Sequence, residues 1–333
     1  MKINLIKTTS WLITLTVVTL MTGYYYFQQQ AEKPLQLEQS TLLIIDKGQF
    51  SNSILGQLKQ QGLIEHTLGL KVMLKLMPEL THVKAGTYEL LPGMNGIDVF
   101  RLIASGKEKQ FAITLIEGLR WQDWRTQIMS DPHITVKDDF EDNVARLVHD
   151  LQGNTLEGWL LPDTYYFVAG TSAFSLVQRA HSEMQSALQN LWQQREQNLP
   201  YTSSYDALIM ASIIEKETAR ADERERIAGV FVNRLRLNMR LQTDPTVIYG
   251  IGEQFDGNIR RKDLRTATPY NTYIIKGLTP TPIAMPSLLA IYAALNPLAT
   301  DELYFVSKGD GSHYFSTTLQ EHNQAVRQYQ LNQ

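Results

Sequence analysis

A long uncharged segment near the N-terminus constrains this chain more than any other feature. No residue from Thr8 to Ala31 is charged, and the apolar part of this segment runs from Trp11 to Phe27. As an α-helix the apolar part would be roughly 25 Å long, which approaches the hydrocarbon thickness of a bilayer. Aromatic residues stand at both of its ends, as is typical of membrane interfaces. The pattern predicts a transmembrane helix at 11–27 that holds a polar body on one side of a membrane.

A cleaved signal peptide is the alternative interpretation of this segment. Three tyrosines and three glutamines follow the apolar run in place of a small-x-small cleavage pattern, which favours an uncleaved anchor. Lys2 and Lys7 precede the span. This positive-inside bias predicts a cytoplasmic N-terminus at 1–10, a single pass, and a periplasmic body outside the inner membrane.

Composition excludes several classes of function. The net charge of −3 gives no basic footprint for nucleic acid. The absence of cysteine excludes disulfides, thiolate metal sites and cysteine nucleophiles. The seven histidines lack the i, i+4 spacing of a zinc-protease helix, and no glycine-rich phosphate loop is present. We therefore expect no metal and no cofactor, and we interpret His313 and His322 as structural or surface residues.

The region after the apolar segment predicts a linker and a small domain. Residues 28–40 are polar and form the linker. Residues 41–107 have the pattern of a strand, two helices and a second strand, followed by a helix that Asn95 would cap. The strands are expected at 41–45 and 86–90.

The remaining residues, 108–333, predict a larger domain that is mostly helical with small sheets, an α+β fold. Hydrophobic residues at helical spacing predict helices in four segments and a hairpin near the C-terminus. The helices are expected at 174–191, 205–218, 222–237 and 287–295, and the hairpin strands at 302–307 and 313–316.

A carboxylate interrupts the apolar helical run at 209–218. Residues three and four apart share a helix face, and those neighbours of Glu215 are all small: Ala211, Ser212, Thr218 and Ala219. A bulky substrate could therefore reach the carboxylate. Its position at the edge of an apolar core predicts a raised pKa, because desolvation disfavours the charged form, and a general acid needs this property. A solvated helix end is the alternative.

This motif and others resemble the YceG-like (MltG) family of endolytic murein transglycosylases. The resemblance rests on motifs that follow one another in order through the C-terminal two-thirds of the chain. They are Leu156 to Tyr165, Glu215-Lys216-Glu217-Thr218, Leu241 to Gly250, Pro269 to Tyr273, Gly277-Leu278, and Tyr304 to Val306 with His313, Phe315, His322 and Asn323.

The resemblance implies a fold with an N-terminal transmembrane helix, a LysM-like subdomain at 41–107 and a catalytic domain at 108–333. In this family the LysM-like module is usually interpreted as a glycan-binding unit, and a spacer that packs on the catalytic domain is the alternative. The implied activity is lytic cleavage of the MurNAc–GlcNAc bond within nascent peptidoglycan strands. Such cleavage leaves 1,6-anhydro-MurNAc ends and terminates strand elongation.

On this resemblance we assign both proton transfers of the reaction to Glu215. As an acid it protonates the leaving oxygen, and as a base it then takes the proton of the C6 hydroxyl that closes the anhydro ring. Planar polar and aromatic side chains are expected to bind the sugars: Gln242, Asp244, Tyr249, Tyr270, Asn271 and Tyr273. Asp163 and Glu217 are helper candidates that the sequence cannot rank.

Two other functions remain open at this level. A hydrolytic muramidase would use a second carboxylate and water. A membrane-tethered peptidoglycan-binding scaffold would depend on the LysM-like half alone. The expected partners are peptidoglycan strands and inner-membrane lipid, and the resemblance adds the peptidoglycan synthases.

Overall fold

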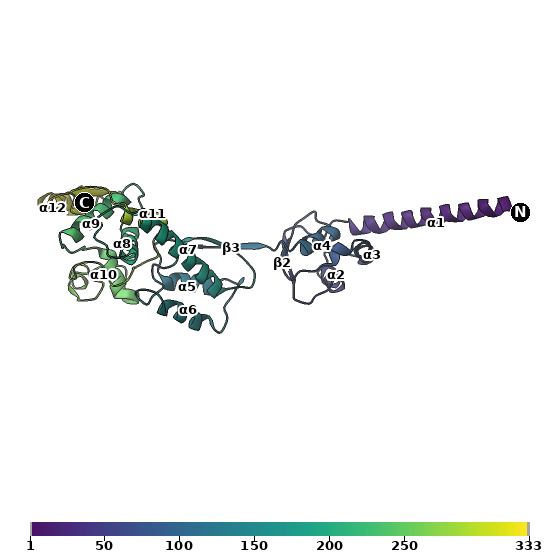
Figure 1. Ribbon diagram of the computed structural model, residues 1–333, viewed down its shortest axis with the longest axis horizontal. Coiled ribbons are helices and arrows are strands. Elements are labelled where there is room, and N and C mark those ends of the chain that lie inside the picture. Colours follow the sequence, from purple (N-terminus) through teal and green to yellow (C-terminus); the bar gives the residue numbers. More distant parts are fainter. Residues whose placement is uncertain (1, 332–333) are drawn as a thin grey trace. The chain divides into compact units, whose positions relative to one another are not determined.

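The computed structural model describes residues 2–331, with side chains from residue 9 onward. The chain forms two compact units. The N-terminal unit contains the chain up to Phe111 together with Tyr166–Ala169, and the C-terminal unit contains Ala112–Tyr165 and Gly170–Gln333. Figure 1 labels the elements of both.

The N-terminal unit has the strand–helix–helix–strand order that the sequence predicts. Its elements are α1 (Lys2–Ala31), β1 (Thr41–Ile45), α2 (Ser51–Gln60), α3 (Leu68–Leu76), β2 (Gly86–Leu90) and α4 (Gly96–Ser105). β1 and β2 pair antiparallel, with Thr41 opposite Leu90. Apolar side chains from both strands and the three short helices form a core, in which Tyr88 and Phe100 are fully buried. The predicted cap is also confirmed, because Asn95 and Asp98 form a capping box at the start of α4.

Helix α1 joins this unit through a close contact with α3. A Cβ atom added at Gly69 would lie 2.7 Å from the Cβ of Gln30 and 2.8 Å from the carbonyl oxygen of Phe27. Glycine therefore lets the two helices approach at this point. Among the helices that the structure describes, none has the length and apolarity needed to cross a membrane.

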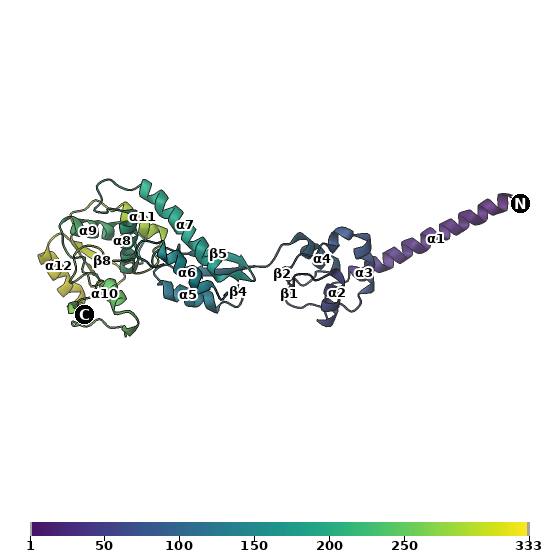
Figure 2. The same cartoon turned by 60° about the horizontal axis from the view of Figure 1, so that its bottom comes forward.

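The C-terminal unit is α+β and mostly helical. Its helices are α5 (Trp121–Ser130), α6 (Phe140–His149), α7 (Ala173–Gln193), α8 (Ser204–Glu217), α9 (Arg224–Arg236), α10 (Asp244–Ile251), α11 (Leu288–Leu295) and α12 (Leu319–Val326). Its strands, some of which cross the boundary between the units, are β3 (Gln110–Leu115), β4 (Ile134–Thr135), β5 (Asp163–Val168), β6 (Thr171–Ser172), β7 (Tyr304–Ser307) and β8 (His313–Ser316). β3 pairs with β5, and β4 pairs with β6. Figure 2 shows α8, α9 and α11 gathered in one part of this unit.

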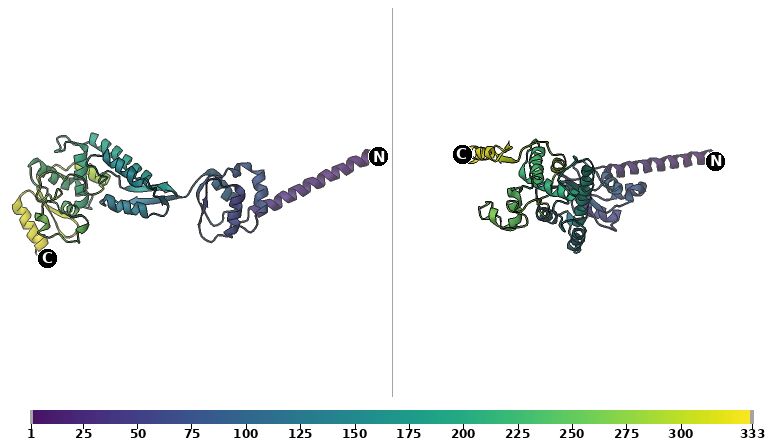
Figure 3. Two further views of the ribbon diagram at one scale, coloured as in Figure 1. Left: turned by 90° about the horizontal axis from the view of Figure 1, so that it is seen from below. Right: turned by 60° about the vertical axis from the view of Figure 1, so that its left-hand side comes forward.

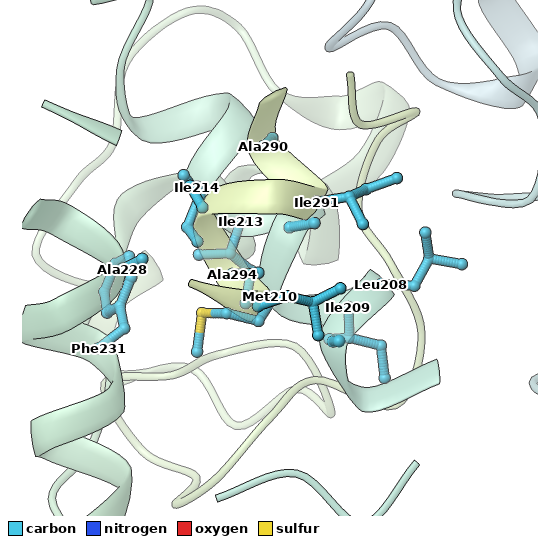
Figure 4. Packing of buried hydrophobic residues seen from close by; sticks show 14 of the residues in the cluster. Leu208, Ile209, Met210, Ile213, Ile214, Ala228, Phe231, Ala290, Ile291 and Ala294 are labelled. Carbon is cyan, nitrogen blue, oxygen red and sulfur yellow. The ribbon is translucent and has the colours of Figure 1, made fainter. Parts of the chain in front are cut away.

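Helix α8 lies at the centre of the core of the C-terminal unit. Every residue from Ala207 to Ile214 is buried, so the helix has apolar side chains all round and no polar stripe. Figure 4 shows Met210, Ile213 and Ile214 packed among residues of α9 and α11. The chain can expose polar groups of α8 only at its two ends. Ser203 caps the first end, and Glu217 is the last residue of the second.

The hairpin of β7 and β8 pairs Phe305 with Phe315, as the sequence predicts for this region. Helix α12 packs against both strands and is the yellow helix of Figure 3. The sequence reasoning did not predict α6, α10 or β5, which are short or follow turn residues. Helix α10 matters most among these, since it begins at Asp244 beside the end of α8.

We expect Gly229→Ala in α9 to destabilise the C-terminal unit by about 1–3 kcal/mol through overpacking. The new Cβ would lie 2.4 Å from the carbonyl oxygen of Leu298, so backbone must move. The matched control is Gly56→Ala in α2, where no atom lies within 4 Å. That change should stabilise its helix by about 0.5–1 kcal/mol. Denaturant unfolding measures both, and stabilisation by Gly229→Ala would contradict the packing described here.

Candidate active site

Two carboxylates lie close together at the end of α8. Glu215 and Glu217 are two residues apart, so their side chains leave the helix in nearly opposite directions. Both are shielded from water, yet their surroundings differ in charge and in hydrogen-bond donors. This difference decides what each carboxyl group can do.

Glu215 is held by groups that stabilise negative charge. The backbone N–H of Ser287 donates to its Oε2 at 2.8 Å, and the Ser287 hydroxyl donates to the same atom. Ser287 is the N-cap of α11, where the helix dipole favours an anion. Arg224 lies 3.7 Å from the other carboxylate oxygen, and the Glu215 side chain is only 5% exposed. Glu215 therefore joins α8 to α11 and α9.

The surroundings of Glu217 favour the protonated form of its carboxyl group. Desolvation by burial raises the pKa of its carboxyl group to about 7, and the nearby charge of Asp244 adds to this effect. Its position on the last residue of α8 acts in the same direction, since the C-terminal end of a helix disfavours negative charge. The Thr243 hydroxyl donates to Oε1, and this hydrogen bond and the charge of Arg234 lower the pKa by less than burial raises it. Glu217 thus holds a proton near neutral pH, as a general acid must.

Glu217 lines a cavity of about 490 Å³ in the C-terminal unit. A cavity of this size is in the range of small-molecule binding sites. Its walls come from the end of α8, the start of α10, the β7–β8 hairpin and α12. The lining side chains with polar groups are Glu217, Arg234, Gln242, Asp244, Tyr273, Tyr304, Ser307, His313, His322, Asn323 and Gln330.

Three of the predicted sugar-binding residues line this cavity: Gln242, Asp244 and Tyr273. The Tyr273 hydroxyl donates to Asp244 at 2.7 Å, so this pair has a fixed geometry. Gln242 adopts a φ of 53°, which non-glycine residues rarely do. Its backbone N–H donates to the carbonyl of Thr272 at 3.2 Å, which ties its loop to the segment before Tyr273. The two motifs are therefore brought together beside Glu217.

The other predicted sugar-binding residues do not line this cavity. Asn271 is fully buried, and its amide donates to the carbonyls of Asp263 and Thr266 while its Oδ1 accepts from the N–H of Tyr273. The structure thus gives Asn271 the role of holding the Tyr273 loop. Tyr270 packs on the core and shares a hydrogen bond with Thr281.

Tyr249 and Asp163 also lie elsewhere. Tyr249 lines a separate pocket of about 290 Å³ that extends along α10. Asp163 is exposed at the start of β5, where its side chain accepts from the backbone N–H of Thr164. Asp163 is therefore not among the described residues that surround Glu217.

Three polar side chains of the cavity were not predicted as site residues from the sequence. His313, His322 and Arg234 line the cavity, although both histidines were expected to be structural or surface residues. Arg234 donates to the carbonyls of Leu303 at 2.6 Å and Leu241 at 2.7 Å, and so joins the hairpin to the Gln242 loop. The signal for the histidines was their place in the last motif, next to Phe315 and Asn323.

Glu157 is a second buried carboxyl group with a raised pKa. Burial raises the pKa of Glu157 to about 7, against hydrogen bonds from the backbone N–H of Trp121 and the hydroxyl of Tyr249 that lower it. Glu157 follows Leu156 in the first of the sequence motifs. It joins the start of α5 to α10 and does not line the cavity of Glu217.

No group of three or more metal-ligating side chains gathers among residues 2–331 as far as the structure describes them. Whether the protein uses a metal or cofactor stays a prediction from its sequence. The arrangement offers one protonated carboxyl group, two imidazoles and several hydrogen-bonding side chains around a single cavity. These groups suit proton transfer to a polyhydroxyl substrate.

Comparisons with known proteins agree over most of the chain. The YceG-like family model matches residues 43–328. An endolytic murein transglycosylase of Bacillus subtilis is 31% identical over 328 residues, which cover 92% of this chain and 90% of the relative. Another, from Streptococcus pneumoniae serotype 2, is 27% identical and is matched over 62% of its length. The crystal structure of a YceG-like protein from Listeria monocytogenes covers 86% of this chain and 99% of its own, with 29% identity and a TM-score of 0.53.

The burial of Glu217 predicts a pH-dependent gain in stability from Glu217→Gln. The folded pKa of about 7 lies above the ordinary 4.5, so the folded state binds the proton more tightly. The wild type's free energy of unfolding therefore falls as pH rises from 4.5 to 7. The full decrease, from well below 4.5 to well above 7, is roughly 3 kcal/mol. Glutamine cannot ionise, so the variant should gain on the wild type between about pH 5 and about pH 8.

Urea unfolding of both proteins at about pH 5 and at about pH 8 measures this gain in the free energy of unfolding. The matched control is Glu302→Gln, because a hydrogen bond from Arg226 lowers the pKa of Glu302. The control should lose the same free energy at both pH values. A Glu217→Gln variant whose difference from the wild type does not change with pH would contradict the buried, protonated carboxyl group.

Proposed function

The chain belongs to the YceG-like family, and from this premise we infer that it is an endolytic murein transglycosylase. It cleaves the glycosidic bond between MurNAc and GlcNAc within peptidoglycan strands and leaves 1,6-anhydro-MurNAc ends. The assignment to a site rests on one observation, the buried carboxyl group of Glu217. This group, with a pKa of about 7, lines a cavity among residues that suit sugar hydroxyls.

The reaction needs a proton donor and then a base, and neither step needs a metal. In the first step Glu217 gives its proton to the glycosidic oxygen, and the bond between C1 and this oxygen breaks. In the second step the C6 hydroxyl of MurNAc attacks C1 and loses its proton. The carboxylate that Glu217 has become is one base for this proton, so a single carboxyl group suffices.

We assign the acid role to Glu217 in preference to Glu215, the choice made from the sequence. Glu215 accepts two hydrogen bonds from Ser287 and faces Arg224, so its negative charge is stabilised and its oxygens are occupied. It also does not line the cavity. Its contacts suit a carboxylate that joins three helices and so keeps the end of α8 in place.

Asp244 and Tyr273 are proposed to orient the sugar, with Gln242 beside them. Asp244 is exposed in the same cavity and accepts from Tyr273, so it has free capacity for a sugar hydroxyl. The alternative of a hydrolytic muramidase also depends on Asp244, since it is a second carboxylate near the acid. The mass of the products distinguishes lytic cleavage from hydrolysis, because an anhydro end lacks one water that a hydrolysed end contains.

The N-terminal unit is proposed to be a LysM-like module. Its strand–helix–helix–strand order supports this, as does a groove of about 1060 Å³ bounded by the loop after β1, α3 and the segment before β2. Glycan binding in this groove is one role, and a spacer on the catalytic domain is the other. A protein that binds peptidoglycan without cutting it would be the scaffold alternative.

Helix α1 is proposed to anchor the protein in the inner membrane, with residues 1–10 in the cytoplasm and the body in the periplasm. Its large apolar side chains are exposed, among them Trp11, Leu12 and Ile13. Four of its threonines satisfy their hydroxyl groups within the helix. The hydroxyls of Thr14, Thr16, Thr19 and Thr22 each donate to the carbonyl four residues earlier. Such bonds lower the cost of placing threonine in lipid. An anchor there would put the cavity near peptidoglycan synthases, the expected partners.

We expect Glu217→Gln to lower cleavage of purified glycan strands by about 10²–10⁴-fold, because the transferable proton is lost. Glu215→Gln is the matched control at the same helix end. It should reduce stability through the lost contact with Arg224 and keep most of the turnover per folded molecule. Mass spectrometry of the products measures both variants of the full-length protein in detergent. The reverse pattern would return the acid role to Glu215.

The anchor makes a separate prediction about location. Extraction from membranes should require detergent, and a reporter fused after Gln333 should be active only outside the cytoplasm. Fractionation, reporter activity and N-terminal sequencing measure this. A mature N-terminus beyond Phe27, or a pool released without detergent, would overturn the anchor.

A further inference from the structure

His313, which lines the Glu217 cavity, forms a carboxylate–imidazole pair with Glu223. Nδ1 of His313 lies 2.7 Å from Oε2 of Glu223, and the backbone N–H of His313 donates to Oε1 of the same residue at 3.0 Å. The two side chains are 12% and 11% exposed. Glu223 precedes α9 and His313 begins β8, so distant segments meet here. Neither residue has a part in the reaction as described above.

The hydrogen bonds of Glu223 fix the proton on one ring nitrogen. A carboxylate only accepts, so Nδ1 of His313 must carry the hydrogen in this contact. The neutral imidazole then has its lone pair on Nε2. The ring is also held by Phe305, whose centroid lies 5.4 Å away in an edge arrangement. Since His313 lines the cavity, it offers the substrate a basic nitrogen in a fixed orientation.

Enzymes use this pairing to take a proton from a hydroxyl group. A buried carboxylate holds the imidazole in the correct tautomer and stabilises the imidazolium that forms when the hydroxyl proton arrives. The second step of the proposed reaction requires such a transfer from the C6 hydroxyl. Glu217 was given above as one base for that proton, and His313 lines the same cavity.

We propose that His313, held by Glu223, is the base that receives the C6 hydroxyl proton, while Glu217 acts as the acid. The inference rests on the proposed function. It divides between Glu217 and His313 the two proton transfers that were given there to Glu217 alone. Glu223 is a positioning residue, because it acts through His313.

The proton and electron balance of this division is complete. The proton of Glu217 goes to the glycosidic oxygen, which keeps the electron pair of its broken bond to C1 and leaves as the GlcNAc hydroxyl. The C6 oxygen forms the new bond to C1, and its proton moves to Nε2 of His313. The enzyme then holds a Glu217 carboxylate and a His313 imidazolium. Proton exchange with water restores both groups, so no further reactant is consumed.

Two variants remove the base in different ways. In His313→Asn the amide can still donate to Glu223 in place of Nδ1–H, but no group replaces Nε2. In Glu223→Gln one amide oxygen remains to accept from the backbone N–H of His313. The amide NH₂ then donates to Nδ1 and moves the ring proton to Nε2, which turns the base into a donor. Glu223→Asp keeps the carboxylate and should restore part of the function.

The readout is the ratio of anhydro ends to hydrolysed reducing ends, measured by mass spectrometry with full-length protein in detergent. If His313 is the base, His313→Asn and Glu223→Gln should lower this ratio at least tenfold, because water competes when the C6 hydroxyl is not activated. The matched control is Asp150→Asn beside His149, an exposed pair 3.3 Å apart. It should leave the ratio unchanged.

An unchanged ratio in either folded variant leaves both proton transfers with Glu217 and overturns the proposal. Circular dichroism and thermal melting show which variants are folded, and His313→Asn is the one whose contacts are best preserved. Failure of the proposed function gives a different result, since the wild type would then produce no anhydro ends or Glu217→Gln would keep full turnover.

Discussion

Glu217 lies at the end of a helix whose central residues are all buried, and the cavity residues are arranged around its carboxyl group. Helix α8 is surrounded by α9 and α11, so a polar group on it is reachable only at an end. Burial, the helix C-terminus and Asp244 all favour the protonated form, and the pKa rises to about 7. The burial that stabilises the unit therefore also raises the pKa of Glu217.

The same few residues of chain provide a second carboxylate with the opposite environment. Glu215 meets the N-terminus of α11 and Arg224, which stabilise its charge and fix the neighbouring helices. Segments far apart in sequence then complete the cavity: the Gln242 loop, the Tyr273 loop and the hairpin with His313. Arg234 and Asn271 hold these segments through backbone carbonyls. A core helix thus carries both carboxylates, and segments tied to it complete the cavity.

Hydrophobic periodicity predicted α2, α3, α7, α8, α9 and α11, and alternation or turns predicted β1, β2 and the hairpin. The candidates Gln242, Asp244 and Tyr273 were chosen for their planar polar or aromatic side chains, and the structure places them in one cavity with Glu217. From the sequence, both proton transfers were assigned to Glu215 and Glu217 was kept as a helper candidate. Both residues share one motif, and only the tertiary neighbours distinguish their surroundings. Asn271 shows the same limit, since an amide that holds a loop and one that binds a sugar look alike in sequence. The pairing of His313 with Glu223 joins residues 90 apart and leaves no local signal.

The ionisation of Glu217 is the most direct test of this account. Carboxyl ¹³C chemical shifts of labelled glutamate, followed across the pH range, report each group that titrates. Glu217→Gln and Glu157→Gln variants assign the two signals expected to titrate near neutral pH. One signal with a pKa of about 7 should disappear in Glu217→Gln. A Glu217 signal that titrates near the ordinary 4.5 would contradict it, because the cavity would then hold no protonated carboxyl group to act as the acid.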